Sequence, residues 1–394
     1  MKEVVIASAV RTAIGNFQGG LSSFSATDLG GLAIRESINR ANIDISQIDE
    51  VVMGNVVPIG LGQNPARQAM IKAQVPMEAG AITVNKVCGS GLKALMLAEQ
   101  AIKCGDAEIV AAGGMESMSN MPYYLDGARD GYRMGHGQLV DGMLHDGLWD
   151  VVNDYHMGYT AELVAEKYSV SREEMDEFAM LSNEKAIDSM DSQKFKDEIM
   201  PVTVKRRKKD PITFDRDEAP RKTTMEILAG LRPAFKGDGL VTAGNASKIS
   251  DGASCLVAMS REKADELGIK PLARIIAQGA AGVDLPDVLV APIKSIPKVL
   301  AKAGLDLNDI DLHEINEAFA VSSVAIIKEL NIDPERVNVH GGAVALGHPI
   351  GCSGARVLTT LLYALKTREK RYGMASLCLG GGEAVSMIVE NLEN

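Results

Sequence analysis

The spacing of apolar residues switches between two periods along the chain, and together these periods predict an α/β fold. Short apolar runs of strand length occupy residues 4–7, 50–53, 81–84 and 108–112. Stretches with helical spacing lie between them at 28–41 and 91–104, and further helices are predicted at 160–167 and 172–188. Strands that alternate with helices are typical of layered α/β proteins.

The helix predicted at residues 91–104 has little polar surface. It begins after glycines and stops at Gly105, where a glycine can close the last turn. Its polar positions fall on one narrow side, and they are Lys93, Glu99, Gln100 and Lys103. Because the rest of its circumference is apolar, we expect this helix to be mostly buried.

A weak internal repeat indicates that one α/β unit occurs twice. The matched positions are Ile48 with Ile310, Ser90-Gly91 with Ser353-Gly354, and Gly113-Gly114 with Gly381-Gly382. The three matches occur in the same order at similar separations, which is the signature of a duplication. The first copy covers residues 1–118 and is completed by about 244–268, and the second covers 269–394. Residues 119–243, which differ in composition, are predicted to form an inserted loop domain.

Composition and charge exclude several classes of function. The 394 residues carry a net charge of −11 and only 4% aromatic side chains, which argues against a nucleic-acid partner. No apolar run reaches the roughly 18 residues of a membrane span, so no membrane association is expected. Five cysteines without paired spacing argue against both a disulfide framework and a metal site. We therefore expect a soluble cytoplasmic protein without a bound metal.

Cys88 is the first candidate for chemistry, because it lies where a predicted strand turns into a helix. Free N–H groups at a helix N-terminus lower the pKa of a thiol and favour the reactive thiolate. A buried structural cysteine at a tight turn is the alternative. The same segment fits the dinucleotide-binding pattern G-x-G-x-x-A from Gly89 to Ala94, but that interpretation leaves Cys88 unexplained and lacks a well-placed acidic partner.

A second candidate segment, residues 340–354, contains five glycines and His348. So many glycines prevent a regular helix and indicate backbone that follows a ligand. His348 stands between Gly347 and Pro349 and is a candidate base for a thiol, although a structural hydrogen bond would also explain it. In the repeat, the helix after His348 corresponds to the helix after Cys88. Equivalent helix starts face one another in a duplicated domain, which predicts that Cys88 and His348 share one site.

Two further segments carry polar chemistry near predicted strand ends. Cys378 precedes three glycines that begin at Gly380, so it offers a second thiol beside exposed backbone N–H groups able to hold an oxyanion. A buried cysteine before a flexible turn is the alternative. Asn316 lies between a strand end and a helix, where it is predicted to orient a water or a histidine, or simply to cap the helix.

These segments together resemble the thiolase family. NKVCGSG around Cys88, NEAFA from Asn316, GGAVALGHPIGCSGAR around His348 and CLGGGEA around Cys378 occur in the family's order and spacing. The resemblance covers the whole chain and is closest to the biosynthetic branch, the acetyl-CoA C-acetyltransferases. It implies a five-layered αβαβα core built from two βαβαβαββ halves, with a loop domain inserted.

The resemblance also implies a reaction, the reversible Claisen condensation of two acetyl-CoA to acetoacetyl-CoA and coenzyme A. Cys88 would be the acylated nucleophile, with His348 as its base and Cys378 as the second acid/base. Asn316 would hold a water that forms one oxyanion hole with His348. The backbone N–H groups of Cys88 and Gly380 would form the other. Coenzyme A thioesters are then substrates, and no separate cofactor is expected.

Family resemblance further assigns the inserted domain to coenzyme A binding and tetramer assembly. The residues expected around the pantetheine and acyl group are His156, Met157, Phe235, Ser247, Ala318 and Phe319. Arg207, within the cationic run 205–209, is expected to approach the nucleotide phosphates, and a solvated loop is the alternative for that run. Residues 119–142 resemble the family's tetramerisation loop, so a homotetramer is expected.

The sequence departs from the family pattern at Glu383, at Lys248 and at 287–292, none of which provides a reacting group. A longer-chain 3-ketoacyl-CoA thiolase is the nearest alternative function, with the same residues and a roomier acyl pocket. A decarboxylating condensing enzyme or a cysteine hydrolase would leave Cys378 without a role. A non-enzymatic lipid-binding relative would be expected to lack one of the two cysteines.

Overall fold

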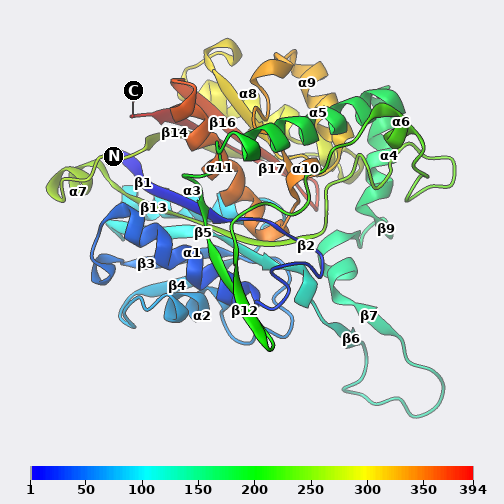
Figure 1. The fold of residues 1–394 in the computed structure, drawn as a ribbon, viewed down its shortest axis with the longest axis horizontal. Coiled ribbons are helices and arrows are strands. Elements are labelled where there is room, and N and C mark those ends of the chain that lie inside the picture. The colour runs from blue at the N-terminus through cyan, green and yellow to red at the C-terminus, as the bar shows by residue number, and fades with distance from the viewer. Residues whose placement is uncertain (1, 394) are drawn as a thin grey trace.

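Two half-sheets, one from each end of the chain, form the centre of the fold (Figure 1). The computed structural model describes residues 2–393. The first half-sheet contains β1 (Val4–Thr12), β3 (Glu50–Gly54), β4 (Gly80–Val84), β5 (Ile109–Ser117) and β13 (Ser250–Ser260). The second contains β14 (Ala273–Gly282), β15 (Leu312–Ile315), β16 (Tyr372–Leu379) and β17 (Glu383–Asn391). A short antiparallel contact between β1 and β14 joins them into one sheet with the order β15-β16-β17-β14-β1-β13-β5-β3-β4.

The two half-sheets share one topology. In the first, β3 is parallel to β5, β5 is antiparallel to β13, and β13 is antiparallel to β1. In the second, β15, β16, β17 and β14 repeat these pairings in the same directions. One strand differs, because the counterpart of β4 is reduced to a parallel bridge between His313 and Val337. The predicted duplication is therefore confirmed, with that strand of the second βαβαβαββ copy missing as a regular element.

Helices cover both outer faces of the sheet and fill the space between its halves. These helices are α1 (Ala26–Ala41), α2 (Pro65–Lys72), α3 (Ser90–Cys104), α8 (Pro292–Ala303), α9 (Ala320–Leu330) and α11 (Ile350–Thr367). On the outer face of the first half-sheet, α1 packs on β1, β5 and β13, and α2 lies beside it. On the outer face of the second half-sheet, α8 packs on β14 and β17, and α9 lies beside it. In the middle, α3 and α11 pack on each other and contact strands of both halves. The predicted αβαβα layering is confirmed.

The two central helices cross at a pair of glycines that the sequence repeat matches to each other. A Cβ atom at Gly91 would lie 2.6 Å from the backbone nitrogen of Ala355. A Cβ atom at Gly354 would lie 2.3 Å from the backbone nitrogen of Leu92. Both distances are too short for a side chain, so α3 and α11 approach at backbone contact. This close crossing brings the first turns of the two helices to one place at the centre of the molecule.

Helix α3 is buried more completely than its sequence predicts. Glu99, expected on its polar side, is only 1% exposed. Gln278 of β14 donates a hydrogen bond to its carboxylate, and Lys103 forms an ion pair with it one turn along the helix. The periodicity of one helix does not reveal this, because the partner that accommodates Glu99 comes from the other half of the chain.

The segment between β5 and β13 lies along one side of the core and includes a projecting arm (Figure 1). Its elements are β6 (Tyr123–Leu125), β7 (Leu139–Asp141), β8 (Trp149–Asp150), β9 (Tyr155–His156), α4 (Met157–Lys167), α5 (Arg172–Asp191), β10 (Ile199–Met200), β11 (Val202–Arg206), β12 (Lys209–Phe214) and α6 (Met225–Ala229). Elsewhere in the chain, short elements are β2 (Gly15–Asn16), α7 (Arg261–Glu266) and α10 (Ala343–Leu346). The arm consists of β6, β7 and the loop between them.

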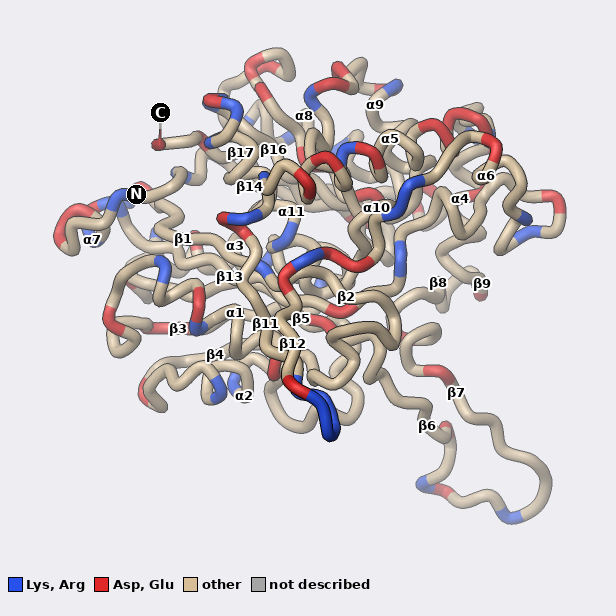
Figure 2. The backbone as a smooth tube through the Cα atoms, viewed as in Figure 1, with Lys and Arg blue, Asp and Glu red and all other residues tan. Residues whose placement is uncertain are grey.

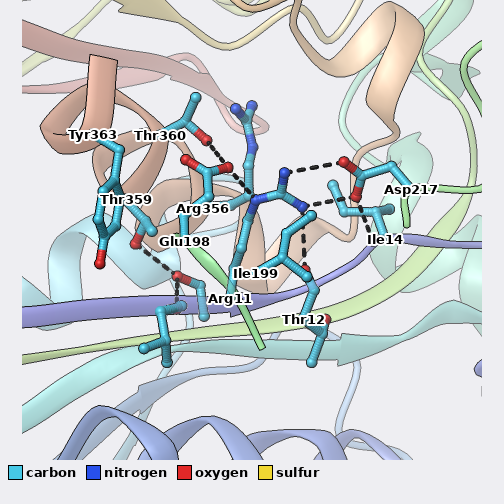
Figure 3. A network of polar contacts seen from close by, with 12 residues as sticks. Arg11, Thr12, Ile14, Glu198, Ile199, Asp217, Arg356, Thr359, Thr360 and Tyr363 are labelled. Atoms are coloured by element: carbon cyan, nitrogen blue, oxygen red, sulfur yellow. Dashed lines mark hydrogen bonds and ion pairs between the residues drawn. The ribbon is translucent and has the colours of Figure 1, made fainter. Parts of the chain in front are cut away.

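A buried ion network anchors this segment to the core (Figure 3). Arg11 of β1 is fully buried, and its guanidinium contacts Glu198 at 2.5 Å and Asp217 at 2.7 Å. Asp217 also accepts the backbone N–H of Ile14, and Glu198 accepts the hydroxyl of Thr360 on α11. Although burial opposes the charge, the two carboxylates hold the pKa of Arg11 above its usual value. The network therefore joins β1, α11 and the inserted segment through paired charges.

Two kinds of feature are not found in the described chain. No helix within residues 2–393 is long and apolar enough to cross a membrane. Across the same residues, no group of three or more His, Cys, Asp or Glu side chains is arranged to hold a metal ion.

Candidate active site

Cys88 lies on a strained turn that enters α3. The preceding residue, Val87, has a φ of +46°, a conformation that β-branched residues rarely adopt. Ser90 holds this turn closed, because its hydroxyl donates to the carbonyl of Val87 at 2.6 Å and accepts the N–H of Lys86 at 2.9 Å. Backbone strain of this kind persists only where surrounding contacts enforce it, and it often marks a functional position.

The Cys88 thiol faces two backbone N–H groups, its own and that of Gly380. Burial nevertheless dominates and raises the pKa of the thiol to about 11, and the carboxylate of Glu116 adds to the rise. The direction of this shift in the thiol pKa is opposite to the one expected from the helix start. Desolvation of a charge outweighs the favourable N–H groups, so the resting group is a thiol that needs a base.

His348 is held at its backbone and at both ring nitrogens. Its N–H donates to the carbonyl of Lys248 at 3.0 Å, and it follows Gly347, whose φ of +111° directs the chain into the cavity. Nδ1 lies 2.5 Å from the hydroxyl oxygen of Ser353, and Nε2 lies 3.4 Å from Nδ2 of Asn316. Burial, aided by the positive charge of Arg356, lowers the pKa of His348 to about 3. The imidazole is therefore neutral at physiological pH.

Cys378 stands near the end of β16, where the strand meets a glycine turn. Gly381 and Gly382 of that turn have φ values of +86° and +82°, which glycine adopts without strain. Burial, and then the proximity of Cys88, raises the pKa of Cys378 well above its usual range. The backbone N–H of Asn316 donates to Ser376 on the same strand at 2.9 Å, which places the amide next to this end of the sheet.

One cavity of about 690 Å³ collects most of the residues that the sequence singled out. Those that line it are Cys88, His348, Cys378, Gly380, His156, Met157, Phe235, Ser247, Ala318 and Phe319. Asn316 is buried against His348 rather than on the cavity wall. Residues from both halves and from the inserted segment thus meet in one space, as the duplication predicts for Cys88 and His348.

An aromatic stack forms one wall of this cavity. His156 lies parallel to Phe235 at 4.7 Å between ring centres, and Phe235 meets Phe319 edge to face at 6.1 Å. Gly158 holds the stack in place, because its N–H donates to Nδ1 of His156 at 2.9 Å. Its backbone lies so close to the Phe235 ring that a side chain at position 158 would clash with that ring. Burial lowers the pKa of His156. The wall is consequently neutral and largely apolar, which suits the pantetheine and acyl part of a ligand.

Arg207 is not brought to this cavity. The cationic run 205–209 spans the turn of the hairpin formed by β11 and β12, visible as the blue tip in Figure 2, and none of its residues lines the cavity. Each of these side chains is exposed.

The three departures from the family pattern each have a partner in the structure. Lys248 lines the cavity, and its ammonium donates to the carbonyls of Ala243 at 2.6 Å and Ala246 at 3.0 Å. Burial, together with the charge of Arg221, lowers the pKa of Lys248 to about 8. In the other two departures, Glu383 pairs with Lys86, and Asp287 pairs with Lys167, both at 2.6 Å.

Several residues of the site were not found by sequence reasoning. Ser353, which contacts His348, is marked in the sequence only by the repeat, and no motif points to Glu116. Trp149 of β8 and Ile350 of α11 also line the cavity, and the sequence pattern does not indicate either of them. For Glu116 the spacing of side chains along the sequence carries no such signal, because its partner Gly351 lies 235 residues away.

Comparison with known proteins now decides the family. The sequence matches the thiolase N-terminal domain over residues 4–262 and the thiolase C-terminal domain over residues 269–391. The chain belongs to the thiolase family. It is 54% identical to an acetyl-CoA acetyltransferase of Pseudomonas aeruginosa, with 98% of this chain and 99% of that protein covered. It is 52% identical to one from Escherichia coli, with 100% of both covered.

A solved thiolase structure has the same fold. The crystal structure of the Bacillus anthracis acetyl-CoA acetyltransferase superposes with a TM-score of 0.98, at 44% identity. The match covers 100% of this chain and 99% of that one. The family and the five-layered thiolase fold predicted from the sequence are both confirmed.

Proposed function

We propose that this thiolase is an acetyl-CoA C-acetyltransferase that interconverts two acetyl-CoA with acetoacetyl-CoA and coenzyme A. The observation that carries the proposal is the meeting of Cys88, His348, Cys378 and the Gly380 backbone at one cavity. Relatives about half identical over the full chain are named for this activity. Coenzyme A thioesters are substrates, and the chemistry requires no further cofactor.

Acylation begins when the Cys88 thiol gives its proton to His348 and its sulfur attacks the acetyl carbonyl. The resulting oxyanion is held by the backbone N–H groups of Cys88 and Gly380, which face the Cys88 sulfur. Collapse of this tetrahedral intermediate breaks the bond between the carbonyl carbon and the sulfur of coenzyme A. The leaving thiolate takes the proton of Cys378, which is a resting thiol because its pKa is raised. Acetyl-Cys88, imidazolium and a Cys378 thiolate remain.

Condensation uses that Cys378 thiolate as the base. A thiol with a raised pKa gives a strong base once it is deprotonated, and it removes an α-proton from the second acetyl-CoA. The enolate oxygen is stabilised by His348 and by a water held by Asn316, and the enolate carbon attacks acetyl-Cys88. The Cys88 thiolate leaves and recovers its proton from His348, which returns every group to its starting state.

Chain-length specificity tests this assignment. We expect thiolysis of acetoacetyl-CoA to be much faster than thiolysis of a ten-carbon 3-ketoacyl-CoA, because the aromatic wall of Phe235 and Phe319 borders the acyl end. Comparable rates on the two substrates would instead assign the chain to longer-chain 3-ketoacyl-CoA thiolases.

We assign coenzyme A binding and tetramer assembly to the inserted segment, residues 119–243, placed between a first half (1–118 with 244–268) and a second half (269–394). His156 and Phe235 of this segment line the cavity. The β6–β7 arm carries exposed apolar side chains, among them Leu139 at 67% and Met134 at 99%. Such exposure supports a contact between copies of the chain in a homotetramer. Light scattering tests this, with Leu139→Lys expected to lower the molecular mass.

We further propose that the enzyme acts in the cytoplasm. The cysteines of the described chain are all free, including the three buried ones, Cys255, Cys352 and Cys378. Free thiols that serve as nucleophile and base are maintained in a reducing compartment.

A further inference from the structure

A buried carboxylate that takes no part in the proposed reaction steps lies next to the apolar cluster against which Cys88 packs. Glu116, on β5, has no exposed surface. One of its oxygens accepts the N–H of Val56 at 2.9 Å and the N–H of Gly351 at 2.8 Å, and the other accepts the side-chain amide of Asn55 at 2.7 Å. A longer contact joins the second oxygen to the N–H of Val57 at 3.4 Å.

These donors come from two segments that flank the reacting groups. Val56 and Val57 belong to a small apolar cluster against which Cys88 packs. Gly351 lies in the first turn of α11, next to Ile350, which lines the cavity and belongs to the same cluster. The carboxylate therefore joins the loop beneath the nucleophile to the start of the helix that follows His348.

The fit around this carboxylate is tight. A Cβ atom at Gly351 would lie 2.5 Å from Oε2 of Glu116, and a Cβ atom at Gly114 would lie 2.0 Å from the carbonyl oxygen of Gly351. Helix α11 approaches β5 this closely only because both positions are glycine. A side chain of another length or shape at position 116 would displace the helix start or leave its N–H group without a partner.

We propose that Glu116 is a positioning residue for the thiolase reaction, whose carboxylate clamps the first turn of α11 to the loop beneath Cys88. This role rests on the proposed function. It fixes His348 and Ser353 relative to the nucleophile, because both lie within three residues of Gly351. Displacing reacting groups by about 1 Å typically costs about 100-fold in rate. The gain in rate from holding the two halves in position therefore outweighs the destabilisation caused by burying the Glu116 carboxylate.

The charge of Glu116 has a separate, measurable effect. It raises the pKa of the Cys88 thiol, so removing it makes that thiol more acidic. Burial raises the pKa of Glu116 itself to about 7, against the N–H donors, and Asp251 of β13 adds to the rise. Three further titratable groups lie near Glu116 or Cys88. The charge of Glu116 contributes to the raised pKa of Cys352, and Cys378 and His348 share the cavity with Cys88.

The test compares Glu116→Gln, which removes the charge but keeps the size, with Gly351→Ala, which displaces the clamp but keeps the charge. We expect kcat of both variants to fall about 10- to 100-fold with little change in KM. Iodoacetamide should alkylate Cys88 about threefold faster at pH 8 in Glu116→Gln, because the thiol is more acidic, and no faster in Gly351→Ala. The exposed Glu108→Gln is the matched control and should leave both readouts unchanged.

A Glu116→Gln enzyme with kcat within twofold of the unmodified protein would overturn the proposal. Should this variant fail to fold, Glu116→Asp keeps the charge and shortens the reach, and normal kcat in that variant would overturn the proposal equally. Alkylation of Cys88 requires no turnover. If the unmodified protein showed no thiolase activity, the proposed function would fail while the alkylation rates still measured the influence of Glu116 on Cys88.

Discussion

The hydroxyl oxygen of Ser353 lies 2.5 Å from Nδ1 of His348, and this contact fixes which nitrogen of the imidazole carries the proton. The same hydroxyl lies 2.9 Å from the carbonyl oxygen of Pro349, which can only accept. The single hydroxyl proton therefore points to Pro349, and the oxygen accepts Nδ1–H of His348. Nε2 keeps its lone pair, faces the amide of Asn316, and is free to act as the base.

Ser353→Ala should lower kcat about 10- to 100-fold while KM for coenzyme A stays nearly unchanged. Without the acceptor oxygen, His348 also adopts the tautomer with a proton on Nε2, which cannot take a proton from Cys88. Histidine ¹⁵N shifts report the tautomer directly and should change in this variant. Ser353→Thr retains the oxygen and is the control; a normal tautomer in Ser353→Ala would contradict the assignment.

Cys88 and Cys378 should be required for different steps of the reaction, Cys88 for covalent acetylation and Cys378 for condensation. Cys88→Ala should abolish covalent acetylation by acetyl-CoA. Cys378→Ala should still be acetylated at Cys88 but fail at condensation, since it lacks the base for the α-proton. Peptide mass mapping after incubation with acetyl-CoA measures this. An acetyl label on Cys378 and none on Cys88 would reverse the two roles.

Asn316→Asp should be more harmful than Asn316→Ala. The amide donates from Nδ2, whereas aspartate would place an anion beside a developing negative charge. The cavity left by alanine still admits a water. The loss of one oxyanion-hole donor typically costs about 100- to 1,000-fold in kcat, with coenzyme A affinity little changed. Asn316 does not cap the following helix, whose N-cap is Phe319, so near-normal turnover of Asn316→Asp would contradict a role of this amide in the oxyanion hole.

The cationic run 205–209 should matter little for chemistry. Because its side chains are exposed at a hairpin turn outside the cavity, replacing all five by glutamine should leave kcat unchanged. Any rise in the coenzyme A KM should be confined to low ionic strength, since salt screens exposed charges over about 10 Å. In 0.5 M salt the screening length falls to roughly 4 Å, so only charges in direct contact still interact strongly. A KM increase that persists under this condition would mean direct contact between this run and the nucleotide phosphates.

Arg11→Met should destabilise the folded protein by about 3–5 kcal/mol, because it leaves the buried carboxylates of Glu198 and Asp217 without their cation. Urea unfolding measures the change. Lys194→Met removes a cation from an exposed pair with Asp188 and should cost about 0.5 kcal/mol or less. Equal losses in the two variants would show that the buried network contributes no more than a surface pair.

Local elements could be predicted well from the sequence. The helix expected at 91–104 is Ser90–Cys104, and the strand expected at 50–53 is Glu50–Gly54, because apolar period and glycine boundaries are local properties. The repeat predicted the duplication, and the family resemblance implied the layered fold. The matched glycines at 91 and 354 lie where the two equivalent helices cross. The reduced strand at Val337 was not foreseeable, because a lone bridge leaves no periodic pattern.

The sequence by itself thus determined the order of elements, the duplication, the thiolase family and which side chains carry chemistry. Tertiary structure decided the state of those side chains. The thiol of Cys88 is less acidic than its place at a helix start indicates, and the clamp at Glu116 is absent from any local motif. The reason is physical. Burial and hydrogen-bond partners set the pKa and the position of a side chain, and these are supplied largely by other segments of the chain, as Glu116 supplies the partner of Gly351. A motif records only neighbours along the chain.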